Sequence, residues 1–134
     1  MKDNKLTIRI KRSVSEVFIP ILDPKNTPKW VDTIVLEKTN EWPPKKGTIY
    51  KSQNPKGDWS EYVLSEFEEN KMFVLSDKGS SYHVRYKFSS ISLKETEIEY
   101  FEWVDNGELD VLLTKEELYK LKQVLEVDFW DQNH

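Results

Sequence analysis

The chain of 134 residues carries a formal net charge of −4 and contains five Trp, six Tyr and six Phe residues but no Cys. Without cysteine there is no disulfide framework, thiolate nucleophile or Cys-based metal site, and because acidic and basic residues are interspersed, no basic stripe is available for nucleic acid. The amino-terminal residues lack the apolar core of a signal peptide, and no run approaches the ~18 apolar residues of a membrane span; we therefore expect one cytoplasmic domain over residues 1–134.

The amino-terminal part of the chain predicts one strand followed by two short helices. Residues 5–10 alternate between apolar and polar side chains, which is typical of a strand. Ser13 and Glu16 have the spacing of a capping box and predict a helix, which Pro20 should kink or shorten. A second short helix is predicted to begin at Thr27, with Thr27 as its N-cap.

Residues 33–104 show no helical period, and breaks rich in Pro, Gly and Asn divide them into six further strands. These strands are predicted at residues 33–38, 48–53, 59–67, 71–76, 81–89 and 95–104. Because the connections are short, the strands should be antiparallel neighbours in a meander, with the first strand of the chain added at an edge.

The last two of these strands allow a pairing register to be predicted. A turn at residues 91–92 would place Lys87 opposite Glu97, which is a favourable charge pair on the outward face. The same register places Glu102 on the inward face, opposite Tyr82. Because neighbouring residues alternate between the faces of a strand, an error of one residue would reverse both assignments.

The carboxy-terminal part of the chain predicts one amphipathic helix. Thr114 and Glu117 form a second capping box, and Leu118, Leu121 and Leu125 form the apolar stripe behind it. This helix is the only large element left to cover the apolar face of the sheet. The sequence therefore predicts an α+β fold in which a seven-stranded curved antiparallel sheet wraps on the C-terminal helix, with two short helices between strands 1 and 2. Because a single helix seldom fills the space beneath a broad twisted sheet, we expect a cavity between them.

This order of elements resembles the helix-grip fold of the START-like, or SRPBCC, superfamily, which includes plant pathogenesis-related allergens, polyketide cyclase/dehydratase-like proteins and chaperone-activator-like domains. The residues that carry the resemblance are Ser13, the run 16–18, Asp23-Pro24, Trp30, Gly47-Thr48, Tyr50 and the runs 63–68 and 121–126. Pro20 and the short last helix depart from the usual pattern. The resemblance implies binding of hydrophobic or aromatic small molecules, and only some members are enzymes.

The first functional hypothesis is a binding module for a small hydrophobic or aromatic molecule. Tyrosine hydroxyls would supply a few polar anchors in a largely apolar wall. The predicted lining residues are Trp30, Tyr62, Tyr82, Tyr86, Tyr100 and Leu121. Because only one histidine, His83, lies within the predicted elements, and is expected on the outward face, we predict neither a metal site nor a cofactor.

Two other functions stay open at this point. Glu102 on the inward face would be desolvated and could act with a tyrosine in proton transfer, as in a cyclase- or dehydratase-like enzyme. Its alternative is an ordinary surface carboxylate, if the strand has reached the rim of the sheet. Phe101 and Trp103 fall on the outward face and would suit a protein-interaction domain of the chaperone-activator-like branch. A monomer and a weak homodimer are both compatible with the sequence.

Overall fold

A computed structural model describes residues 2–128 of the chain. Strand β1 (Asp3–Ile10) is followed by helix α1 (Val14–Leu22) and the 3-10 helix η1 (Thr27–Lys29). After the remaining strands, helix α2 (Lys115–Gln123) continues into the π-helical turn η2 (Val124–Asp128). The remaining strands are β2 (Leu36–Thr39), β3 (Ile49–Gln53), β4 (Trp59–Glu68), β5 (Met72–Asp77), β6 (Tyr82–Ser92) and β7 (Glu95–Val104).

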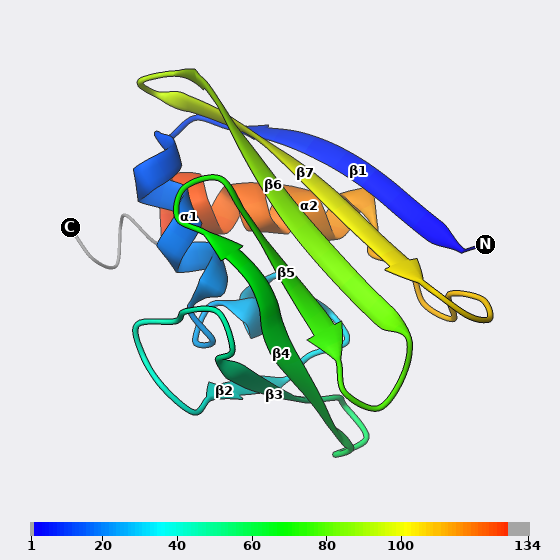
Figure 1. Ribbon diagram of the computed structural model, residues 1–134. Coiled ribbons are helices and arrows are strands. Elements are labelled where there is room, and N and C mark those ends of the chain that lie inside the picture. Colours follow the sequence, from blue (N-terminus) through cyan, green and yellow to red (C-terminus); the bar gives the residue numbers. More distant parts are fainter. Residues whose placement is uncertain (1, 129–134) are drawn as a thin grey trace.

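The seven strands form a single antiparallel sheet in the order β1-β7-β6-β5-β4-β3-β2. Figure 1 shows how strongly this sheet curves from the long β6 and β7 to the short β2 and β3, while α2 lies across one of its faces. The predicted α+β helix-grip architecture is confirmed, including the meander, the edge position of β1 and the two short helices between the first two strands.

The predicted register of the last two strands is wrong by two residues. Lys87 lies opposite Glu99 rather than Glu97, because β6 continues to Ser92 and the ladder shifts between Ser90 and Ser92. The turn therefore falls later than residues 91–92. A displacement by an even number of residues leaves each side chain on its predicted face, so the inward and outward assignments hold although the partners do not.

The role predicted for Thr27 also requires correction. Asn26, not Thr27, occupies the N-cap position of η1. The hydroxyl of Thr27 instead donates a hydrogen bond to Oε1 of Glu37, on β2, over 2.6 Å. The side chain of Thr27, which the sequence pattern assigned to a helix end, therefore holds the carboxylate of Glu37 instead.

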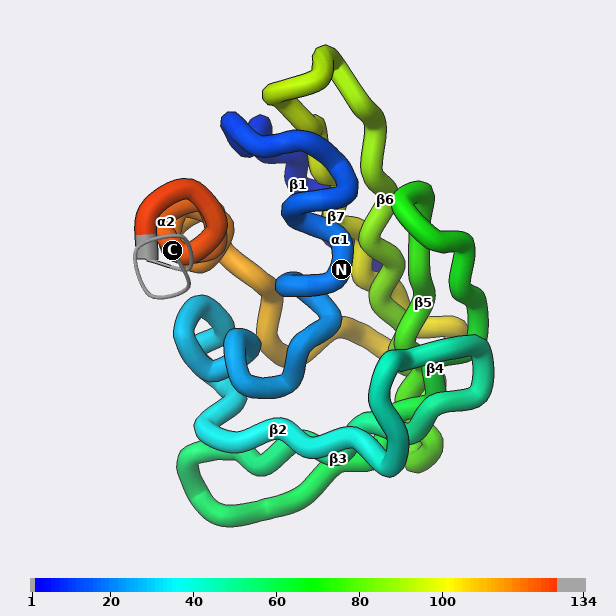
Figure 2. The backbone as a smooth tube through the Cα atoms, turned by 90° about the vertical axis from the view of Figure 1, so that its left-hand side faces the viewer, coloured from blue at the N-terminus to red at the C-terminus, as the bar shows by residue number. Residues whose placement is uncertain are grey.

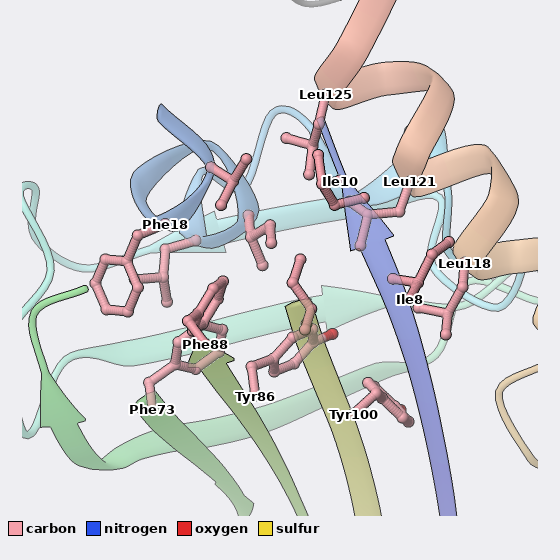
Figure 3. Close-up of a cluster of buried hydrophobic side chains, with 14 of the residues drawn as sticks. Ile8, Ile10, Phe18, Phe73, Tyr86, Phe88, Tyr100, Leu118, Leu121 and Leu125 are labelled. Atoms are coloured by element: carbon pink, nitrogen blue, oxygen red, sulfur yellow. The ribbon is translucent and has the colours of Figure 1, made fainter. Parts of the chain in front are cut away.

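The three leucines of the predicted apolar stripe are all buried in the hydrophobic core. Leu118, Leu121 and Leu125 are each 1% exposed, and they project from the helix towards Ile8 and Ile10 of β1 (Figure 3). Figure 2 shows α2 beside the β1–β7 edge of the sheet, at a distance from β2 and β3. Within residues 2–128, no helix is long and apolar enough to cross a membrane.

Candidate ligand cavity

A cavity of about 650 Å³ lies over the inner face of the sheet, from β2 to β7. Its wall opposite the sheet is made by the end of α1, by η1 with Trp30 and Val31, and by residues 111–113. From α2 only Glu117 reaches it. The prediction that the hollow lies directly beneath the helix is therefore wrong: the leucines fill that space, and the cavity lies beside them.

The cavity opens at the turn between β3 and β4. Pro55, Lys56 and Asp58 line it and are exposed to solvent. The side-chain oxygen of Asn54 accepts hydrogen bonds from the backbone N–H groups of Lys56 and Asp58, both over 2.9 Å. Gly57 has a φ of 93°, a left-handed conformation that glycine adopts without steric cost. The rim is therefore a hydrogen-bonded turn.

Five of the six predicted lining residues lie on the wall of this cavity. They are Trp30, Tyr62, Tyr82, Tyr86 and Tyr100. Their rings meet edge to face, with centroid distances of 5.2 Å for Tyr86 and Tyr100 and 6.4 Å for Tyr62 and Tyr82. Leu121 does not lie on the wall, because its side chain is part of the core under α2. That the five aromatic residues bind a ligand stays a prediction.

Glu102 lies on the cavity wall and is only 2% exposed, so it is not a surface carboxylate. Its Oε1 accepts hydrogen bonds from the hydroxyls of Tyr82, over 2.7 Å, and Tyr100, over 3.3 Å. Its Oε2 accepts from the side-chain amide of Asn4 and the backbone N–H of Leu113, both over 2.8 Å. Glu102 therefore joins β1, β6 and β7 to the segment that covers the cavity.

A second carboxylate of the cavity wall, Glu37, was not found from the sequence. Its Oε1 accepts a hydrogen bond from Thr27, and its Oε2 accepts one from Ser52 over 3.0 Å. Burial raises the pKa of Glu37 to about 7, against the lowering effect of the hydroxyls of Thr27 and Ser52 and with a further rise from the charge of Asp23. Glu37 thus changes its charge near neutral pH.

The acidic groups of the wall act on the same tyrosines. Burial raises the pKa of Tyr86 well above its ordinary value, and the charges of Tyr82, Glu37, Glu102 and Glu117 raise it further. Glu117 is itself buried and accepts hydrogen bonds from the backbone N–H groups of Thr114, over 3.0 Å, and Asp32, over 2.9 Å. The acidic groups of the wall therefore add to the effect of burial in keeping Tyr86 un-ionised.

The outward-facing aromatic residues form a stacked row. Trp103 stacks on His83 and on Phe101, with centroid distances of 4.9 and 5.3 Å, and the guanidinium of Arg85 lies over Phe101. The ring nitrogens of His83 lie 2.8 Å from Ser76 Oγ and 2.8 Å from a carboxylate oxygen of Asp105. The faces predicted for these residues are right. Because none of them lines the cavity, we interpret the row as a stabilising layer on the outer face of the sheet.

Comparison with known proteins identifies the fold and no more. No protein-family model matches the chain, and no curated protein matches it. Among solved structures, the protein XoxI from Bacillus cereus has a TM-score of 0.73 at 17% identity, over 100% of this chain and 99% of its own. The Aha1 dimer from Colwellia psychrerythraea has a TM-score of 0.71 at 14% identity, over 95% and 98% of the two chains. A protein from Nitrosomonas europaea has a TM-score of 0.71 at 12% identity, over 99% and 97%. The chain therefore shares its α+β fold with small bacterial proteins along its whole length.

Proposed function

We propose that this protein belongs to the START-like superfamily and binds a small, largely apolar molecule in the cavity between the curved sheet and the segments that cover it. The observation that carries the proposal is the cavity itself. Its volume of about 650 Å³ falls within the range of ~300–1,000 Å³ that is typical of small-molecule sites.

The composition of the wall supports the same function. Small-molecule sites combine apolar and aromatic walls with a small number of polar groups that orient the ligand. Here the aromatic side chains stand beside two carboxylates, the partly buried Glu37 and the buried Glu102. A hollow of this size also costs stability, because the side chains around it lack contacts on one side. A bound molecule would restore those contacts.

Binding is favoured over catalysis by Glu102. A carboxylate has about four acceptor positions, and four groups already donate to Glu102. A general base needs a free position to take a proton from its substrate. The cyclase- or dehydratase-like alternative therefore receives no support from the geometry of this residue.

The protein-interaction alternative is weaker than ligand binding. The structural neighbour from Colwellia psychrerythraea is an Aha1 dimer, which supports a homodimer as a further state of this fold. However, Phe101 and Trp103 stack on each other and on their neighbours, and both are only partly exposed. We propose a monomer or weak homodimer, with a small molecule as the main partner and neither a cofactor nor nucleic acid involved.

The proposal is tested by titrating the protein with N-phenyl-1-naphthylamine, a neutral dye that fluoresces in apolar surroundings. We expect saturable binding with one dye per chain. Leu75 lies on the wall, and a Leu75→Trp variant should weaken binding because the larger ring occupies part of the hollow. Leu36→Trp, at an exposed position outside the wall, is the matched control and should bind normally. Absence of binding by folded wild-type protein, or equal binding by both variants, would contradict the proposal.

A further inference from the structure

We propose that the ligand of this cavity is an organic cation, an amine or quaternary ammonium group attached to an apolar or aromatic body, and that its positive charge lies beside Glu37. The inference rests on the proposed function, since it specifies the ligand of the same cavity. It goes beyond that function because a hollow with aromatic walls alone would accept neutral molecules equally well.

The distribution of charge on the wall is the first argument. Among residues 2–128, the acidic side chains that line the cavity are Glu37, Asp58, Asp77, Glu102 and Glu117. Lys56 is the one basic side chain of that wall, and it lies at the exposed rim. A cleft that is lined by one sign of charge and has low-dielectric walls concentrates ligands of the opposite sign. An anionic ligand would be repelled from the interior.

Glu37 is the second argument, because its partly buried carboxylate lacks the partners that the two buried carboxylates of the wall, Glu102 and Glu117, have. Each of its oxygens accepts one hydroxyl hydrogen bond, from Thr27 or from Ser52, and so retains room for another partner. Within the described part of the chain, no Lys or Arg forms an ion pair with it. Charges removed from water are normally paired; Glu37 is partly buried, and a cationic ligand would supply the missing charge.

The two buried carboxylates of the wall, Glu102 and Glu117, show what a fully hydrogen-bonded group looks like in this protein. Glu102 accepts four hydrogen bonds. Glu117 accepts from the backbone of Thr114 and Asp32 and from the hydroxyl of Thr114, and so caps α2 and fixes the loop after η1. Both therefore have structural partners. Asp77 accepts hydrogen bonds from Gly79 and Ser80, and Asp58 is exposed at the rim, which leaves Glu37 as the interior carboxylate available to a ligand.

The aromatic side chains of the wall are the third argument. Trp30, Tyr62 and Tyr86 line the same hollow as Glu37, and the charge of Glu37 contributes to raising the pKa of both tyrosines. The faces of such rings attract cations, and desolvated pairs contribute more than exposed ones. A weakly hydrated quaternary ammonium group between a carboxylate and aromatic rings is the ligand group that matches this combination.

The test compares two molecules that differ only in charge, benzyltrimethylammonium and its neutral isostere neopentylbenzene, with phenylacetate as the anionic counterpart. Binding is measured above neutral pH, where Glu37 is ionised, through the tryptophan fluorescence of the protein, to which Trp30 on the wall contributes, and by displacement of N-phenyl-1-naphthylamine. We expect the cation to bind at least ~10-fold more tightly than its neutral isostere, and phenylacetate to bind more weakly than both. In Glu37→Gln, which keeps the size of the side chain, this preference for the cation over its neutral isostere should fall below ~3-fold.

The control variant is Glu61→Gln, which removes a carboxylate that is not on the cavity wall and pairs with Lys78; the preference for the cation should persist in it. If neopentylbenzene binds as tightly as the cation, or if Glu37→Gln keeps the full preference, the inference is wrong while the proposed function stands. If no compound binds, including the neutral dye, the proposed function fails and the inference fails with it.

Discussion

Glu37 and Glu102 are both inward-facing carboxylates, but they are held in different ways. Glu102 connects three strands and the covering segment, because its four donors come from β1, β6, β7 and Leu113. Glu37 is held by the hydroxyls of Thr27 and Ser52 at the other end of the sheet. We therefore expect replacement of Glu102 to affect mainly folding, and replacement of Glu37 to affect mainly the pH dependence of the protein and its choice of ligand.

Replacing Glu102 by Gln should reduce the free energy of unfolding by about 1–3 kcal/mol. A glutamine has one acceptor oxygen and a donor amide, so the amide would face groups that themselves donate. Urea unfolding followed by tryptophan fluorescence measures the change. Glu99→Gln is the control, because Glu99 pairs with Arg85 on the partly exposed outer face, where such a pair contributes about 0–1 kcal/mol. Equal losses in the two variants would show that the buried network has no special role.

Glu37 should make the protein less stable as the pH rises. Burial raises the pKa of Glu37 in the folded protein to about 7 from an ordinary value of 4.5. Between these values the folded protein holds a proton that the unfolded chain has released, so the free energy of unfolding falls with rising pH and levels off above the folded pKa. The loss should be on the order of 1–3 kcal/mol between about pH 5 and about pH 8.

The measurement is urea unfolding of wild type and Glu37→Gln at these two pH values. The variant lacks the titrating group, so its stability should change less with pH than that of wild type, and it should be the more stable protein at the higher pH. Parallel pH profiles for the two proteins would show that Glu37 titrates normally in the folded state.

At the scale of single elements, β2 shows why the sequence did not reveal Glu37. Val35 and Leu36 are 49% and 40% exposed, whereas Glu37 between Leu36 and Lys38 points inward onto the cavity wall. Hydrophobic alternation assumes that the apolar side chains face the core, and in β2 this assumption is wrong. The pairing of Glu37 with Ser52 across β2 and β3 would have been the informative signal, but it depends on a register that the sequence does not specify.

The register of β6 and β7 shows a second limit to what the sequence could predict. The alternating pattern correctly predicted which side chains of β6 and β7 point inward and which point outward. A register shift of one residue would move the apolar side chains to the outer face, so the pattern excludes it. A shift of two residues preserves the faces, so only the turn decides between the two registers. Here β6 continues to Ser92, and the ladder irregularity after Ser90 was not recognisable in a run of small polar residues.

A substitution in the core beneath α2 should lower the stability of the protein without changing ligand binding in the cavity. Leu121 is fully buried against the β1 side of the core and does not line the hollow. Leu121→Ala should therefore reduce the free energy of unfolding by about 2–5 kcal/mol, while the folded fraction keeps its affinity for N-phenyl-1-naphthylamine. Leu36→Ala, at an exposed position, should be nearly neutral in both measurements. A loss of dye affinity in folded Leu121→Ala would place the hollow beneath the helix after all.

For the whole molecule, the order of the elements was predictable because several independent signals in the sequence agree with it. Capping boxes mark the helices, breaks separate the strands, and a single amphipathic helix remains to cover the sheet. The expectation of a cavity also followed from that order. Its position did not, since it depends on where η1, Trp30 and residues 111–113 fold over the sheet, and these segments have no periodic pattern that fixes their path.

The central claim is that a small molecule enters the hollow beside α2, and intermolecular nuclear Overhauser effects test it most directly. With N-phenyl-1-naphthylamine at saturation, the dye protons should give signals to the methyl groups of Leu75, Val84 and Leu113, which line the cavity. The methyl groups of Ile91 and Leu93, exposed near the β6–β7 turn, should give none. Signals confined to the exposed methyl groups, or no signals at all, would contradict the account.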